Sequence, residues 1–328
     1  MRRREFIGVL IGGATPWGFV AAKAAERMRH IGVLMAVAEN DPVAQPWVAA
    51  LHERLEQLGR QIGRTLRIDY RWAAGSLKLA DALAKELVGL HPDLLLATNT
   101  AIAVALQKAT RDTPIVFLLA DPVAGGLVSN LAHPDGNMTG FIANEPYIAG
   151  KQLELLKEIA PGIRRVIILS NPAAAPFRTE WVEVAEKSGR SLDLEVIAAP
   201  VDSAEKIEGA MLLWGSRTSA ALLVLGDITT LNNRQLIATL AVRHHLPALY
   251  QYPFFVRSGG LACYGPDITG QYRQAAEYIN RILNGAKVRD LPVQAPTNFE
   301  LVINLKAAKE IGLEISPALL QRANEVIE

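Results

Sequence analysis

Short apolar runs alternate with amphipathic stretches along the first part of this chain. The apolar runs predict buried strands at residues 30–37, 66–72, 93–97 and 115–119, and the stretches between them predict helices at residues 47–58, 77–87 and 100–109. Strands separated by helices in this way form a parallel sheet that helices cover. Three of these stretches, 30–37, 93–97 and 115–119, are mostly continuous apolar runs, which indicates strands buried on both faces, whereas 66–72 carries Ile68 and Tyr70 on one face. This order therefore predicts an α/β fold.

The alternation breaks over residues 121–147 and then restarts. The passage is rich in glycine and proline, so we predict an irregular segment in which the chain crosses between domains. Further strands are expected at residues 165–169, 193–198, 220–225 and 247–252, and around Cys263. The chain thus has two α/β halves of the same class, and two lobes with a cleft between them are the economical packing. Ligands of such sheets bind outside the carboxyl ends of the strands.

The N-terminus has the three-part layout of an export signal. Arg2, Arg3 and Arg4 precede an uncharged run over residues 8–22, and Ala22-Lys23-Ala24 follows. The run is shorter than the roughly 20 residues that span a bilayer as a helix. The paired arginines followed by Glu5-Phe6-Ile7 are typical of the twin-arginine route. We therefore expect residues 1–24 to be a leader cleaved near Ala24, and the mature chain to be periplasmic. The alternative is a buried N-terminal helix of a cytosolic protein.

The charge balance bears on nucleic-acid binding, and the cysteine content bears on disulfide formation. The 328 residues carry 34 Lys and Arg against 33 Asp and Glu, which leaves no basic excess of the kind that nucleic-acid binding needs. Cys263 is the single cysteine, so no intrachain disulfide forms. Its apolar neighbours predict a small core residue in a buried strand. We expect no nucleic-acid partner.

Motifs for catalysis, metals and cofactors are missing from the sequence. It contains no G-x-S-x-G, no H-E-x-x-H, no Walker loop and no G-x-G-x-x-G after the first strand. The six histidines are scattered, and His244 and His245, adjacent at a helix end, point about 100° apart and make poor co-ligands. We expect no catalytic residues, no metal and no cofactor.

Polar residues at predicted strand ends are the candidate ligand contacts. Asn99 and Thr100 follow the third strand and open a helix, where hydroxyl, amide and backbone N–H groups hold an anion such as a carboxylate. Asp121 and Asp227 follow strands in the two halves, where a carboxylate pairs with a ligand ammonium. The alternative for these residues is ordinary helix capping.

Five further residues are candidate ligand contacts. Asn171 follows a strand of the second half, and Tyr250 and Tyr252 flank another strand end, where aromatic rings either stack on a ligand or belong to the core. Asn40, in the loop after the first strand, and Tyr147, at the end of the irregular passage, complete the set.

Several blocks of the chain resemble one family. The sequences PIVF, DPV, GLVS and PDGNMTG occupy residues 114–117, 121–123, 126–129 and 134–140, and matching C-terminal blocks occupy residues 260–265, 282–285, 291–293 and 303–313. In this order they are similar to periplasmic substrate-binding proteins of bacterial ABC importers, of the tryptophan/tyrosine type. The resemblance spans nearly the whole mature chain.

The resemblance implies a type I periplasmic-binding-protein fold, with two Rossmann-like lobes and hinge crossovers. We expect one lobe at residues 25–146 and about 255–295, and the other at 147–254 and about 296–328. In the amino-acid-binding relatives, a turn matching Asn99-Thr100 holds the ligand carboxylate, and an acidic residue matches Asp227.

The implied function is capture of a small ligand, an amino acid or related carboxylate, and its delivery to an ABC permease by a monomer. A ligand-sensing subunit of a membrane receptor is one alternative, and a two-lobed α/β enzyme, such as a racemase or hydrolase, is another.

Overall fold

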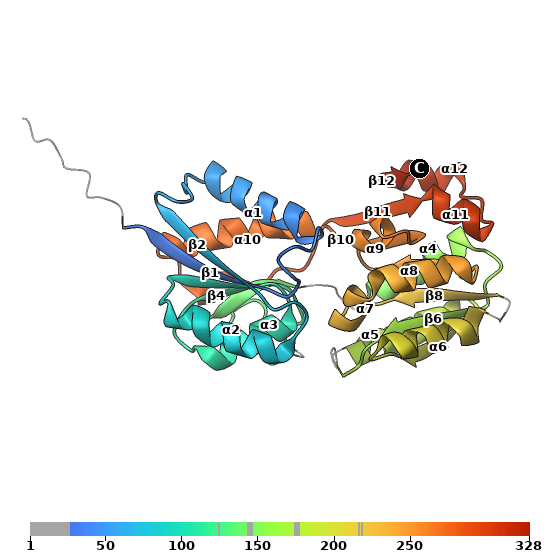
Figure 1. The fold of residues 1–328 in the computed structure, drawn as a ribbon, viewed down its shortest axis with the longest axis horizontal. Helices are drawn as coiled ribbons and strands as arrows, with labels where there is room; N and C mark the ends of the chain where they lie inside the picture. The colour runs from blue at the N-terminus through green and yellow to red at the C-terminus, as the bar shows by residue number, and fades with distance from the viewer. Residues whose placement is uncertain (1–26, 124, 143–146, 174–177, 216, 218) are drawn as a thin grey trace, which may run out of the picture.

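The structure is a computed structural model that describes residues 27–328, apart from 124, 143–146, 174–177, 216 and 218. The expected leader lies outside the described residues. Within them, two α/β lobes stand side by side, and the chain passes between them more than once (Figure 1). The predicted fold class is confirmed.

The first lobe is a five-stranded parallel sheet in the order β2-β1-β3-β4-β5. Its strands are β1 (Arg29–Met35), β2 (Leu66–Trp72), β3 (Leu94–Ala97), β4 (Ile115–Ala120) and β5 (Met138–Ile142). Helices α1 (Ala44–Gln57) and α10 (Ile268–Leu283) cover one face, and α2 (Leu77–Gly89) and α3 (Thr100–Ala109) cover the other (Figure 1). The central strands are buried on both faces, which explains their unbroken apolar runs.

The second lobe is built on a seven-stranded sheet in the order β12-β11-β10-β9-β8-β6-β7. Only β10 and β11 pair antiparallel among its described strands. The strands are β6 (Arg165–Ser170), β7 (Glu195–Pro200), β8 (Ala220–Val224), β9 (Ala248–Tyr250), β10 (Ala262–Pro266), β11 (Phe299–Asn304) and β12 (Glu325–Ile327).

Eight α-helices among the described residues belong to this second lobe. They are α4 (Ile148–Ile159), α5 (Arg178–Ser191), α6 (Ala204–Gly215), α7 (Ile228–Asn232), α8 (Arg234–Arg243), α9 (Pro253–Arg257), α11 (Leu305–Ile311) and α12 (Pro317–Arg322). A 3₁₀ turn, η1 (Val288–Asp290), lies next to β5 in the first lobe.

Three features differ from the sequence-based expectations. The passage 121–147 is not irregular throughout, because β5 forms within it and completes the first sheet. Gly140 interrupts the apolar run of β5, since a Cβ there would lie 2.0 Å from the Phe117 carbonyl oxygen. Strand β9 ends at Tyr250, and the short helix α9 follows. Strand β12 closes the chain after α12, where only a helix was expected.

The division of the chain between lobes also differs from expectation. The expectation places residues from about 255 in the first lobe, whereas β10 pairs with β9 and β11 in the second sheet. The chain returns to the first lobe at α10, which packs on α1, where Arg54 pairs with Glu277 and Arg60 donates to Asn280. We therefore propose lobe boundaries of 27–142 with 267–295, and 147–266 with 296–328.

Candidate functional site

A cavity of about 110 Å³ lies where the carboxyl ends of strands from the two lobes meet. We call it the interlobe cavity. The first lobe contributes residues after β1 and β3 and from the end of β4, and the second contributes residues after β8 and β9. Most of its lining is apolar, including Met35, Val37, Leu77, Leu119 and Leu231. Its position is the one at which open α/β sheets hold their ligands.

The start of α3 supplies polar groups to the interlobe cavity. The Asn99 side chain accepts from the Ile102 N–H at 2.8 Å and so caps the helix. The first N–H groups of a helix have no intrahelical partner, and those of Thr100 and Ala101 belong to residues that line the cavity. The positive end of the helix dipole therefore faces the cavity, which favours a carboxylate there.

Two threonines beside Asn99 hold the cavity wall in place. The Thr98 hydroxyl donates to the Leu34 carbonyl oxygen at 3.1 Å and accepts from the Ala36 N–H at 2.9 Å. The Thr100 hydroxyl accepts from the Asp121 N–H at 2.9 Å. The Thr98 hydroxyl thus joins the ends of β1 and β3, and the Thr100 hydroxyl joins the start of α3 to the end of β4, beside the interlobe cavity.

Asp227 contributes the only charged side chain among the described residues that line the interlobe cavity. It caps α7 in a capping box: one carboxylate oxygen accepts from the Thr229 and Thr230 N–H groups at 2.8 and 3.0 Å. The other oxygen accepts from the Asn171 N–H at 2.7 Å. These bonds fix the carboxylate in one orientation, opposite the start of α3.

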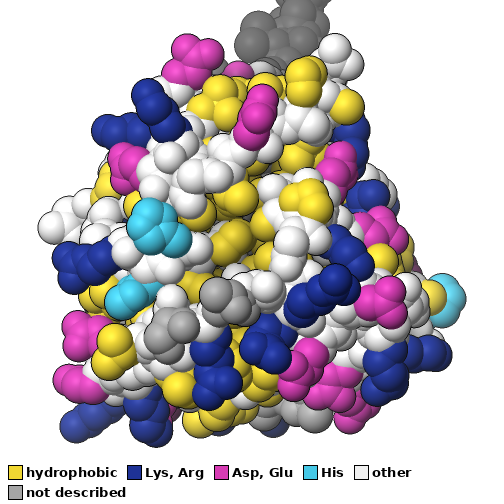
Figure 2. Space-filling model, turned by 90° about the vertical axis from the view of Figure 1, so that its right-hand side faces the viewer, with side chains coloured by type: hydrophobic (Ala, Val, Ile, Leu, Met, Phe, Trp, Pro, Cys, Tyr) yellow, Lys and Arg dark blue, Asp and Glu magenta, His cyan; other side chains and the backbone are white. Residues whose placement is uncertain are grey.

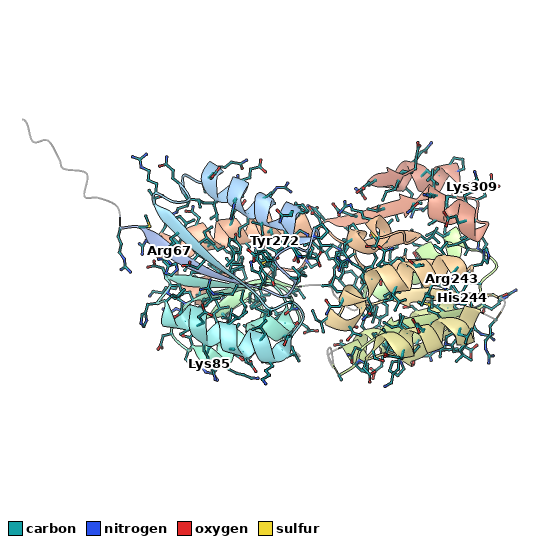
Figure 3. The ribbon with its side chains drawn as sticks, viewed as in Figure 1. Arg67, Lys85, Arg243, His244, Tyr272 and Lys309 are labelled. Atoms are coloured by element: carbon teal, nitrogen blue, oxygen red, sulfur yellow. The ribbon has the colours of Figure 1, made fainter. Side chains whose placement is uncertain are left out.

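Aromatic rings from both lobes form one wall of the interlobe cavity. Trp47 of α1 meets Phe254 of α9 edge to face across the lobe boundary, with ring centroids 6.2 Å apart. Phe254 in turn stacks on Tyr252 at 5.3 Å, and Trp47 stacks on Tyr272 at 5.7 Å. Tyr272 is fully buried inside the first lobe (Figure 3). Such a wall suits an apolar or aromatic ligand group.

Four of the predicted site residues lie together in the interlobe cavity. They are Asn99, Thr100, Asp227 and Tyr252. Asn171 is buried directly behind Asp227, where its side-chain amide donates to the Thr229 hydroxyl at 2.8 Å. The capping alternative is also correct for Asn99 and Asp227, because both cap helices while lining the cavity.

The other four predicted residues do not line the interlobe cavity. Asn40 is exposed in the loop after β1, and Tyr147 is 60 % exposed at the start of α4. Asp121 is held behind Thr100 by its backbone N–H. Tyr250 belongs to the core: it is fully buried and stacked on Phe255 at 5.0 Å, and burial raises the pKa of its phenol.

Sequence reasoning missed Trp47, Phe254 and Leu119 as lining residues. Trp47 lies on the buried face of an amphipathic helix, so its sequence context matched an ordinary core position. Phe254 belongs to α9, which was not predicted, although Pro253 at the first helical position is a recognisable start signal. Leu119 has a φ of +50° next to a register shift in β4, and no sequence pattern announces that.

A separate hollow of about 470 Å³ occupies the far end of the second lobe. Pro161, Ile163, Leu246 and the two adjacent histidines line it. Figure 2 shows this end of the molecule, where apolar side chains reach the surface among charged groups of both signs. His244 ends α8 as expected, and it lies at the end of the lobe that faces away from the interlobe cavity (Figure 3).

Other chemistry is sparse in the described part of the chain. Cys263 is buried in β10, and burial raises the pKa of its thiol, which keeps it protonated and unreactive. No cluster of three or more His, Cys, Asp or Glu side chains is arranged there to hold a metal ion. None of the helices described is both long and apolar enough to cross a membrane.

The fold and the cavity define a two-lobed solute-binding protein of the type I periplasmic class. A family model described as "ABC transporter substrate binding protein" matches residues 30–327, and the chain belongs to that family. A tyrosine-binding protein from Clostridioides difficile is 25 % identical over 292 residues, which cover 88 % of this chain and 83 % of the relative.

Two solved structures are similar over almost their whole length. A conserved domain protein from Vibrio cholerae has a TM-score of 0.84 at 28 % identity, covering 92 % of this chain and 100 % of that one. An ABC domain in complex with L-Trp from Streptococcus pneumonia has a TM-score of 0.83 at 27 % identity, covering 91 % and 99 %. Both share the two-lobed architecture.

Proposed function

We propose that this substrate-binding protein captures an aromatic amino acid in the interlobe cavity and delivers it to an ABC importer. The observation that carries the proposal is the arrangement of the cavity: a helix N-terminus on one side, a single acidic side chain on the other, and an aromatic wall between the lobes. Two relatives, a tyrosine-binding protein and an ABC domain in complex with L-Trp, support the same substrate class.

In this proposal each part of a zwitterion has a counterpart. The α-carboxylate binds the N–H groups of Thr100 and Ala101, at the positive end of the α3 dipole. The α-ammonium lies against Asp227, whose carboxylate is held in place by backbone N–H groups. The ligand side chain packs on the rings of Trp47 and Phe254.

The mechanism follows from the two-lobed architecture. The ligand touches α3 and α7 at once only when the lobes are closed, so ligand binding shifts the open–closed equilibrium toward closure. The closed protein then presents both lobes to the permease. The chemistry requires no covalent step. We further propose that the mature chain is a periplasmic monomer released by cleavage near Ala24.

A ligand screen with the mature protein tests the substrate class. L-Tryptophan, L-tyrosine and L-phenylalanine should each stabilise the fold, by about 2.7 kcal/mol at 100 times the dissociation constant. L-Alanine and L-glutamate serve as matched amino acids without an aromatic ring, and indole-3-propionate as a ligand without the ammonium. Stabilisation by the propionate equal to that by tryptophan would remove Asp227 from the site. A lack of any response to the aromatic amino acids would refute the substrate class.

A further inference from the structure

A second crevice lies on the other side of the aromatic wall. Its volume is about 540 Å³, and it shares Trp47, Phe254 and Ile268 with the interlobe cavity. The rest of its lining includes Val43 of the first lobe and Glu300 of the second. We call it the crossover crevice, because α10 and β11 run from it into opposite lobes (Figure 1).

Glu300 is the uncompensated charge of the crossover crevice. Its side chain is about half-buried, and it takes part in no hydrogen bond or ion pair with the described residues. The two arginines that line the crevice are already neutralised: Arg257 pairs with Glu325 at 2.7 Å, and Arg234 pairs with Asp41 at 2.9 Å.

The field around Glu300 is also net negative. Burial is the main cause that raises the pKa of its carboxyl, and the neighbouring Asp267 and Glu325 carboxylates raise it further against the opposing effect of Arg257. A half-buried carboxylate in a negative field, with no cationic partner among the described residues, attracts a cation to the crevice. A cation in the crevice would supply the missing partner.

We propose that the crossover crevice binds a small organic monocation, a primary amine with an aromatic or aliphatic body. The ammonium pairs with Glu300, and the body packs against Trp47 and Phe254, where a cation near the rings is also favoured. The ligand carries no carboxylate, because both lining arginines are held by acidic partners. This site is distinct from the cavity of the proposed transport ligand and extends beyond that function.

The location gives the bound amine a role in lobe closure. The crevice walls come from both lobes, with Val43 and Trp47 on one side and Phe254 and Glu300 on the other. An occupant therefore contacts both lobes only when they are together, as in the interlobe cavity, and it raises the population of the closed state. Amine binding and amino-acid binding then strengthen each other by the same factor.

Titration calorimetry with 2-phenylethylamine on the otherwise unliganded mature protein tests the proposal. The wild-type protein should bind it saturably, and 2-phenylethanol, which lacks the charge, should bind at least about tenfold more weakly. Glu300→Gln should weaken amine binding by about tenfold or more, whereas Glu314→Gln, at an exposed glutamate, should leave it unchanged. Asp227→Ala, which alters the interlobe cavity alone, shows by comparison with Glu300→Gln which of the two carboxylates the amine contacts.

Three results would overturn the site. They are no saturable amine binding, equal binding of the neutral alcohol, and a loss of amine binding in Asp227→Ala but not in Glu300→Gln. The last result would place the amine in the interlobe cavity instead. Because no amino acid is present in the measurement, its failure leaves the proposed transport function untouched.

Discussion

Arg234 and Asp41 form an ion pair across the lobe boundary, with 2.9 Å between the guanidinium nitrogen and the carboxylate oxygen. Arg234 begins α8 in the second lobe, and Asp41 lies in the β1–α1 loop of the first. Both side chains are largely buried, at 19 % and 14 % exposure. Nearby, a Cβ on Gly75 of the first lobe would lie 2.3 Å from the Asn232 side chain. The α7–α8 corner thus closes against two loops of the first lobe.

The first prediction is that the ion pair between Asp41 and Arg234 stabilises the closed state of the two lobes, and we call it the latch for this reason. Lobe opening solvates both charges, so the pair stabilises the closed state alone. Asp41→Asn should therefore weaken aromatic amino-acid binding by about 1–2 kcal/mol, or roughly tenfold in the dissociation constant. Calorimetry measures the affinity, and X-ray scattering of the unliganded protein should show a more open average shape.

Two controls separate the latch from a general loss of stability. Asp202→Asn removes an exposed ion pair with Lys206 within the second lobe and should not change affinity. The exchange of charges in the double variant Asp41→Arg with Arg234→Asp should recover part of the lost affinity. Wild-type affinity in Asp41→Asn would show that the pair does not contribute to closure.

The second prediction separates the two roles of Asp227. Asp227→Asn retains a side-chain oxygen that can cap α7, so the melting temperature should change little, while amino-acid affinity falls because the charge is lost. Asp227→Ala should lose affinity and also about 1 kcal/mol of stability. If the Asn variant binds the amino acid as tightly as the wild type, the carboxylate serves as a cap alone.

The third prediction concerns the strained Leu119. Its φ of +50° is unfavourable for leucine but not for glycine. Leu119→Gly and Leu119→Ala both remove the side chain that lines the interlobe cavity, so both should weaken ligand binding. The glycine variant should be more stable than the alanine variant by about 1 kcal/mol, because only glycine relieves the strain. Chemical denaturation of the pair measures this difference, and the reverse order would contradict the strain.

The fourth prediction concerns pH and Glu300. Its folded-state pKa is raised from 4.5, chiefly by burial, so the folded protein holds this proton more tightly than the unfolded chain. The resulting stabilisation is present below the unfolded pKa and is lost as the pH rises through the folded pKa. Glu300→Gln should therefore gain stability relative to wild type as the pH rises above 4.5, the ordinary pKa of a glutamate carboxyl. Thermal melts of both proteins measure this gain, and a pH-independent difference would contradict the raised pKa.

Much of the fold could be predicted from sequence because parallel strands buried on both faces need unbroken apolar runs. The stretches 93–97 and 165–169 match β3 and β6 closely for this reason. Strand β5 escaped prediction because Gly140, which the close approach to Phe117 requires, breaks its apolar run. Strand β12 is only three residues long and half-exposed, so no period or burial pattern marks it.

Some residues of the candidate site could be predicted from local sequence, and others could not. Asn99 and Asp227 were predictable because each caps a helix directly after a buried strand, and both the capping oxygen and its place at a strand end are local properties of the sequence. Trp47 and Phe254 were not predictable, because their contact depends on how the two lobes pack.

The sequence by itself determined two α/β halves and the polar strand ends, because burial and helix capping are set by neighbouring residues. Only the tertiary structure decided that β10 joins the second sheet while α10 returns to the first lobe, and that Asp41 meets Arg234. Asp41 and Arg234 are 193 positions apart, and nothing in the local pattern on either side specifies the partner on the other.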